Sequence, residues 1–200
     1  VEEYYYITDD QNLLSLYQLT GNPVSITIPY LNNTAYECHV FDELDSRSLG
    51  TSQTISQRTV FIGKNIADIG VSGEEVFNKE GLTIIGANMN APVIQPNSND
   101  SDVRFNFSYP VKLENLVFDG ENKPLDNYFL HVDGGAQSSG LVMKDITLRN
   151  IGNSNSVSST NKAVINVEDG TQRNVNAHRY FQNITIESAQ IASNKSVVDI

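Results

Sequence analysis

A short strand pattern recurs along this 200-residue chain and constrains its fold more than any other feature. Each copy has a turn-forming residue, an apolar residue, Thr or Val, a second apolar residue, a variable residue, and then Gly, Asn or Ser. The copies are GLTIIG from Gly81, NLVFDG from Asn115, DITLRN from Asp145 and NITIES from Asn183, separated by 34, 30 and 38 residues. The alternation predicts β-strands, and the period predicts stacked supersecondary units.

A second strand recurs out of phase with the first. Its copies are NYFLHV from Asn127, KAVINV from Lys162 and KSVVDI from Lys195, with a weaker copy at Phe105–Phe107. Strands of fixed length joined by loops of variable length fit the coils of an all-β solenoid. An antiparallel β-sandwich is the alternative, although it explains the two-phase repeat poorly.

If neighbouring coils pair in parallel, about 4.8 Å apart, equivalent side chains stack into columns. Two inward columns are predicted, one of Leu82, Leu116, Ile146 and Ile184, the other of Ile84, Phe118, Leu148 and Ile186. The preceding positions predict a polar ladder at a bend, where side chains bond the turn backbone and the next coil, at Asn115, Asp145 and Asn183.

The stretches GLTIIGAN, VKLENLVFDGENK, LVMKDITLRNIGN and YFQNITIES resemble coils of the right-handed parallel β-helices of the pectin lyase-like superfamily, over about residues 77–200. The resemblance implies a right-handed parallel β-helix. The superfamily includes pectate and pectin lyases, polygalacturonases, phage tailspikes and adhesive domains of bacterial surface proteins, and the chain is most like the adhesive domains.

The N-terminal part predicts a cap on these coils. ITDDQNLLSLYQL reads as a short amphipathic helix that begins at Thr8, Asp9 or Asp10 and ends near Gly21. Strands are expected at 24–31 and 59–62, with a polar loop at 32–56. We therefore divide the chain into a cap (1–75) and β-helix coils (76–200). Because KSVVDI begins a coil, we expect either that the coils continue in a longer parent chain or that another chain covers this end.

Charge and cysteine content exclude several classes of protein. The net charge of −11, from 24 acidic and 13 basic residues, argues against a nucleic-acid partner. No apolar run is long enough to cross a bilayer, so membrane insertion is not expected. Cys38 is the only cysteine, which excludes an internal disulfide and predicts a buried thiol.

The outward positions of the repeated strand contain the candidate ligand-binding residues. Asp119, Arg149 and Glu187 would form a column of alternating charge, with Glu121 beside it. One interpretation is a structural ladder, in which each cross-strand pair contributes about 0.2–1 kcal/mol. The other, drawn from the β-helix resemblance, is a polar face that binds sugar hydroxyls or uronate groups.

No catalytic set accompanies this face. The polygalacturonase signatures NTD, DD, GHG and RIK are absent from the repeated strands, and so are the pectate lyase arginine motif and its WxDH-type signature. No metal ligand or cofactor is assigned. Oxygen-rich loops can bind Ca²⁺. The candidates lie in FDGENKPLD and VEDGT, although ordinary solvated loops explain these stretches as well; they are Asp119, Glu121, Asp126, Glu168 and Asp169.

These observations predict an adhesin-like binding domain that is secreted or displayed on a cell surface. Its expected partner is a polysaccharide or a host-surface glycoprotein. The alternative is a fragment of a polysaccharide lyase, a glycoside hydrolase or a phage tailspike depolymerase. A stalk without a ligand is a third, weaker interpretation.

Overall fold

Parallel β-strands dominate the structure. The computed structural model describes residues 2–45, 57–69, 79–96, 105–125, 128–133, 140–154, 163–168, 179–191 and 196–200. Within these ranges every strand pair except one is parallel. The predicted all-β class and parallel pairing are therefore confirmed, and an antiparallel sandwich does not describe the fold.

The larger sheet contains ten of the described strands. Eight lie in the order β13 (Arg179–Ile186), β11 (Leu141–Arg149), β9 (Val111–Asp119), β6 (Leu82–Gly86), β4 (Gln57–Ile62), β1 (Glu2–Ile7), β3 (Thr34–Phe41) and β2 (Val24–Ile28). The other two are β5 (Ile66–Ile69) and β7 (Val93–Pro96), which pair with each other, and β7 also pairs with the C-terminal half of β9. This parallel ladder continues into the segment 1–75 that was predicted to form the cap.

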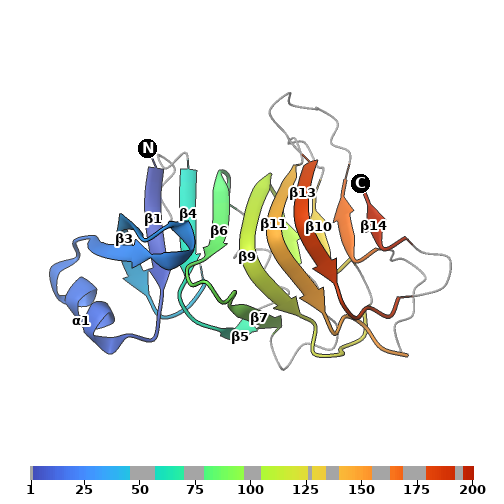
Figure 1. Cartoon of the computed structure of the whole chain (residues 1–200), viewed down its shortest axis with the longest axis horizontal. Helices are drawn as coiled ribbons and strands as arrows, with labels where there is room; N and C mark the ends of the chain where they lie inside the picture. Colours follow the sequence, from blue (N-terminus) through green and yellow to red (C-terminus); the bar gives the residue numbers. More distant parts are fainter. Residues whose placement is uncertain are drawn as a thin grey trace.

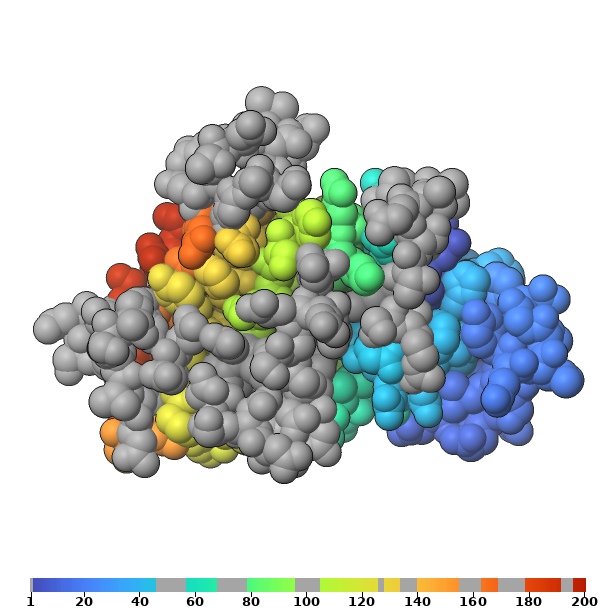
Figure 2. All heavy atoms as spheres, turned by 180° about the vertical axis from the view of Figure 1, so that it is seen from behind, coloured from blue at the N-terminus to red at the C-terminus, as the bar shows by residue number. Residues whose placement is uncertain are grey.

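A smaller sheet faces the larger one. It contains, in order, β14 (Val198–Asp199), β12 (Ile165–Val167), β10 (Leu130–Val132) and β8 (Phe105–Phe107). From β8 to β14 the chain alternates between the two sheets. Figures 1 and 2 show the N-terminal part of the chain, with the helix, at one end of the long axis and the C-terminal strands at the other, and Figure 1 shows β1 between β3 and β4.

The strand register confirms the predicted side-chain columns across β9, β11 and β13. It corrects the pairing of β6 with β9. Leu116 pairs with Ile146 and then Ile184, and Phe118 follows the same path to Leu148 and Ile186. Leu82, however, pairs with Val111, and Ile84 pairs with Leu113. Gly81 and Asn115 both have positive φ and both precede an apolar residue, which made two different bends of the chain look equivalent.

The main core lies between the two sheets. The Phe105 ring of β8 lies 5.2 Å from Phe118 of β9 and 5.3 Å from Phe129, measured between ring centroids. All three side chains are at most 2% exposed. Apolar side chains from both sheets belong to the same buried cluster.

The predicted N-terminal helix is present as α1 (Gln11–Thr20). Asp10 is its N-cap, because its carboxylate accepts hydrogen bonds from the backbone N–H groups of Asn12 and Leu13. The helix ends at Gly21, whose φ of 68° allows the left-handed C-cap. In the described ranges no helix has both the length and the apolar character needed to span a bilayer.

Three N-terminal strands differ from the expectation. Sequence analysis placed a loop over 32–56, but β3 occupies Thr34–Phe41, and β1 was not predicted. The predicted strand 24–31 ends at Ile28 and continues as the 3₁₀ helix η1 (Pro29–Leu31). The polar residues of β3 hid its alternation, because Glu37 is exposed while the neighbouring Cys38 is buried.

A second, smaller core lies on the opposite face of the larger sheet, where side chains of β2 and β3 meet those of β4 and β6. It contains Ile26, Ile28, Cys38, Phe61, Ile85 and Ala87. Ile85 occupies the position of the repeat equivalent to Asp119, which was predicted to face outward, and it is instead 7% exposed, because side chains of β2 and β3 cover it. Cys38 is fully buried as predicted, and burial raises the pKa of its thiol to about 12.

Candidate functional site

Three strands of the larger sheet bend at equivalent residues. Asn115 in β9, Asp145 in β11 and Asn183 in β13 have φ angles of 56°, 55° and 54°. Asn and Asp tolerate this left-handed region better than other residues with a side chain, apart from glycine. These are the residues of the predicted polar ladder. The bend gives the sheet two outer surfaces, one before it and one after it.

Side-chain hydrogen bonds join the rungs at this bend, as predicted. The Asn183 Nδ2 group donates to Asp145 Oδ1 at 2.7 Å. Asn115 Nδ2 donates to the backbone oxygens of Gly86 and Asn88 at 2.9 and 2.7 Å. Asn115 is 5% exposed, so its amide satisfies carbonyl groups that water reaches poorly.

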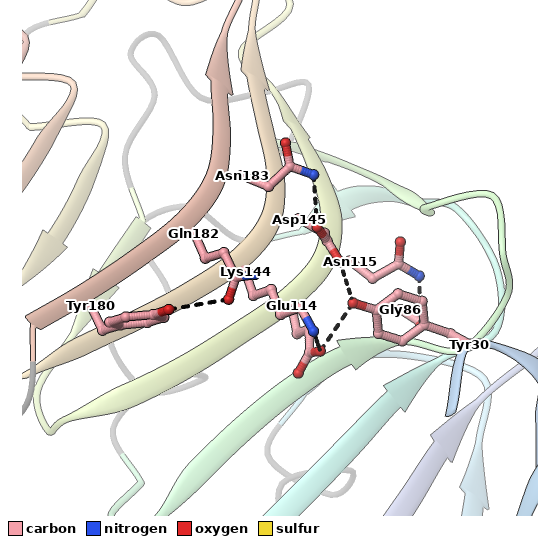
Figure 3. A network of polar contacts seen from close by, with 9 residues as sticks. All are labelled: Tyr30, Gly86, Glu114, Asn115, Lys144, Asp145, Tyr180, Gln182 and Asn183. Atoms are coloured by element: carbon pink, nitrogen blue, oxygen red, sulfur yellow. Dashed lines mark hydrogen bonds and ion pairs between the residues drawn. The ribbon is translucent and has the colours of Figure 1, made fainter. Parts of the chain in front are cut away.

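Tyr30 joins this ladder from the N-terminal part of the chain (Figure 3). Its hydroxyl is shared between Asp145 Oδ2 at 2.6 Å and Glu114 Oε1 at 3.0 Å. The hydrogen bond from Tyr30, followed by the one from Asn183, lowers the pKa of the Asp145 carboxyl. Burial, together with the two carboxylates, raises the pKa of the Tyr30 phenol.

Before the bend, two rows of side chains cross the outer surface of β9, β11 and β13. One row contains Glu114, Lys144 and Gln182, and the other contains Lys112, Val142 and Tyr180. The Lys144 ammonium lies 3.8 Å from Glu114 Oε1, and the Tyr180 hydroxyl donates to Gln182 Oε1 at 3.2 Å. We call Glu114, Lys144, Tyr180 and Gln182 the outer strip (Figure 3).

The Tyr180 ring is the aromatic group of the outer strip, and it is 55% exposed. An exposed aromatic ring presents an apolar face at low conformational cost. The neighbouring amide, ammonium and carboxylate groups supply both hydrogen-bond donors and acceptors. The outer strip can therefore stack against one part of a ligand and hydrogen bond with another.

After the bend, the structure brings Asp119 and Arg149 together in register, as predicted. Arg149 Nε donates to Asp119 Oδ2 at 3.0 Å. Asp119 also accepts from Asn150 Nδ2 and from the backbone N–H of Glu121 at 2.8 Å. The Asp119 residue is only 7% exposed, which corrects the expectation that it faces outward. These contacts favour the structural interpretation for this pair.

The other two predicted ligand-binding residues are exposed. Glu121 lies in the turn after β9 and contacts Asp119 through its backbone. Glu187 follows β13, and its backbone N–H donates to the carbonyl of Leu148 at 2.9 Å, which places it beside the end of β11. No ion pair joins Glu187 to Arg149 in the described part of the chain, so the three-membered charge column is not continuous.

The outer strip and Tyr30 were missed for different reasons. Gln182, Lys144 and Glu114 occupy the same position in RYFQN, LVMKD and VKLEN, and Tyr180 lies two positions before Gln182, so extending the repeat towards the N-terminus would have found both rows. Tyr30 carries no such signal, because its partner Asp145 is 115 residues away in the sequence. Of the Ca²⁺ candidates, Asp126 and Asp169 lie outside the described residues, Asp119 accepts a hydrogen bond from Arg149, and Glu121 and Glu168 are exposed.

Comparisons with known proteins add no name to this geometry. The chain matches no protein-family model, no curated protein and no solved structure.

Proposed function

We propose that this chain is a right-handed parallel β-helix that acts as an adhesin-like binding domain, exported or displayed on a cell surface. Its partner would be a polysaccharide or a host-surface glycan. The alternation of the chain between two parallel sheets supports the solenoid, and so does the 30 to 38-residue repeat. The resemblance of the repeats to pectin lyase-like coils supports the handedness.

The observation that carries the binding proposal is the exposed Tyr180 ring beside the polar members of the outer strip. Sugars offer an apolar ring face and a rim of hydroxyl groups, which matches an aromatic surface flanked by hydrogen-bonding groups. Parallel strands repeat about every 4.8 Å, so a polymer lying across them can make similar contacts on successive rungs. Several weak contacts on one polymer then combine into useful affinity.

The binding test uses the protein with a panel of neutral and acidic polysaccharides, with and without Ca²⁺. Co-sedimentation reports binding, and size-exclusion of the recovered polymer reports cleavage. Bound polymer of full length supports the binding domain. Shortened polymer would support the alternative, a fragment of a lyase, a hydrolase or a tailspike depolymerase.

Variants locate the binding surface. Tyr180→Ala should weaken binding about tenfold, because truncating an aromatic side chain that stacks on a ligand costs about 1–2 kcal/mol of binding free energy. Lys144→Gln should weaken binding to acidic polymers more than to neutral ones. Leu19→Ala is the control, since Leu19 is 85% exposed on α1, away from the outer strip. Unchanged affinity in both strip variants would exclude this surface.

The predicted column is tested separately with Arg149→Gln and Glu187→Gln. If these variants lose affinity for the polysaccharide while Tyr180→Ala does not, the binding surface is the part of the sheet after the bend and not the outer strip.

A further inference from the structure

The smaller sheet carries a group of metal-ligating side chains on its outer side. His131 lies in β10 between Leu130 and Val132, which are both fully buried, so its ring points away from the core. Asp133 directly follows β10, and Glu168 directly follows β12. Each lies two residues after a residue of its strand whose side chain points away from the core. Their backbone N–H groups continue the pairing of the strands, to the carbonyls of Phe107 and Val132.

The potential ligand atoms of these three residues converge. The His131 nitrogen and one oxygen from each carboxylate all lie within 4.8 Å of one another. His131 Nε2 lies 3.6 Å from Glu168 Oε1. This separation is too long for a good hydrogen bond. It is close to the roughly 3.3–3.5 Å that separates two ligands of a tetrahedral ion with bonds of about 2.0–2.2 Å.

A chain of hydrogen bonds fixes the tautomer of His131. Asn166 Nδ2 faces Asp199, at 3.1 Å from Oδ2 and 3.3 Å from the backbone oxygen. The Asn166 amide oxygen therefore faces His131, and it lies 2.7 Å from Nδ1. Because this oxygen only accepts, His131 Nδ1 carries the hydrogen and the neutral ring keeps its lone pair on Nε2.

This arrangement is the one that orients a metal-bound histidine. Such a ring donates its second N–H to an oxygen acceptor, which fixes both its tautomer and its orientation. Here Asn166, only 4% exposed, is that acceptor. The Tyr128 ring stacks on His131 with centroids 4.9 Å apart and an interplanar angle of 16°, which further restricts the imidazole plane.

We propose that His131 Nε2, Asp133 and Glu168 bind a divalent transition-metal ion of the zinc type. An imidazole nitrogen with two carboxylates suits zinc and its neighbours, whereas Ca²⁺ and Mg²⁺ take oxygen ligands. The site lies on the smaller sheet and does not depend on the outer strip. It shares Glu168 with the acidic loops considered for Ca²⁺, and it differs from a Ca²⁺ site because it requires the histidine.

His39 offers a matched comparison in the same chain. Its Nδ1 lies 2.8 Å from the Tyr17 hydroxyl, and its Nε2 lies 3.5 Å from Glu3 Oε2. The ring is thus held in a similar way and faces one carboxylate. Within the described residues, however, only the His131 group brings three ligands together.

The test is titration calorimetry of the metal-stripped protein with Zn²⁺ in a buffer that does not chelate it. We expect one zinc-binding event that Ca²⁺ and Mg²⁺ do not displace. His131→Gln, Asp133→Asn and Glu168→Gln should each weaken it by about tenfold or more. His39→Gln should leave the affinity unchanged. Replacing Zn²⁺ with Co²⁺ should give visible absorption bands that His131→Gln removes.

The outcomes separate the proposal from weak surface binding. Asp133→Asn and Glu168→Gln replace exposed carboxylates with amides of the same shape, so both variants should unfold at the wild-type denaturant concentration. Absence of zinc binding by the wild type overturns the proposal. So does a zinc affinity that is equal in the wild type and the three ligand variants, or that falls in His39→Gln instead.

Discussion

Tyr30 joins parts of the chain that are far apart in the sequence. Its hydroxyl bridges Glu114 and Asp145, which are 84 and 115 residues away. Tyr30→Phe removes the donor and leaves two carboxylates close together. We expect the free energy of unfolding to fall by about 1.5–3 kcal/mol, the range for a hydrogen bond to a charged group. Urea denaturation monitored by circular dichroism measures this loss.

Tyr180→Phe is the matched control for this prediction. It also removes a tyrosine hydroxyl with a side-chain acceptor, but on an exposed residue. Its loss should stay within about 0.5 kcal/mol, as is usual at the surface. Equal losses in the two variants would mean that the Tyr30 bridge contributes nothing beyond an ordinary surface contact.

Asp145 makes a pH-dependent contribution to stability. The hydrogen bonds from Tyr30 and Asn183 lower its pKa from the ordinary value of 3.8. A carboxyl with a lowered folded-state pKa stabilises the protein above its unfolded-state pKa, and this stabilisation disappears as the pH falls through the folded-state pKa. Asp145→Asn should therefore be less stable than the wild type at pH 7, and the difference should shrink below pH 3.8.

Denaturation at a series of pH values from neutral to strongly acidic tests this prediction. The Tyr30→Phe background provides the control, because the Tyr30 hydrogen bond is the largest cause of the lowered pKa. In that background, the pH dependence that Asp145→Asn removes should be smaller. A stability difference that grows towards acid would contradict the assignment.

At the scale of elements, the bend depends on the close approach of β6 to β9. Gly86 ends β6, and a Cβ there would collide with the Asn115 backbone oxygen and come within 2.5 Å of Pro92 Cδ. The collision involves backbone, which cannot move without disturbing the ladder at Asn115. Gly86→Ala should lower the free energy of unfolding by about 2–3 kcal/mol, measured by urea denaturation.

Gly21→Ala provides the comparison for the element scale. A Cβ at Gly21 meets no atom within 4 Å, so only its φ of 68° opposes the change. The left-handed conformation costs an alanine about 1 kcal/mol. If Gly86→Ala were no more destabilising than Gly21→Ala, the close approach at the bend would not be rigid.

At the scale of the whole molecule, the core between the sheets holds the two sheets together. Phe105 is fully buried and comes from the smaller sheet, while its neighbour Phe118 comes from the larger one. Phe105→Ala should cost about 3–5 kcal/mol of unfolding free energy, the range for a buried phenylalanine. A single denaturation transition should report this loss.

Phe181→Ala is the control at this scale. Phe181 packs against the same core but is only partly buried, in β13. Its truncation should cost less, on the order of 1–2 kcal/mol. If truncating Phe105 cost no more than truncating Phe181, the core between the sheets would not be what holds them together.

The sequence by itself determined the parallel strands, most columns of the core and the ladder at the bend. These features depend on residues that recur at equivalent positions, and such a repeat can be recognised from the sequence alone. Leu116, Ile146 and Ile184 stack because each follows a residue that tolerates a left-handed backbone. The capping residues of α1 were also readable, since capping acts over three or four positions.

Only the tertiary structure decided which side chains are covered and which distant groups meet. Asp119 lies at an outward position of the repeat, yet the turn beyond it and Asn150 enclose its carboxylate. Tyr30 reaches Asp145 because η1 lies beside the end of β6, where the Tyr30 backbone N–H donates to the carbonyl of Ala87. His131 meets Glu168 because their strands pair. Contacts between residues far apart in the sequence depend on the path of the loops between them, and the repeat does not specify that path.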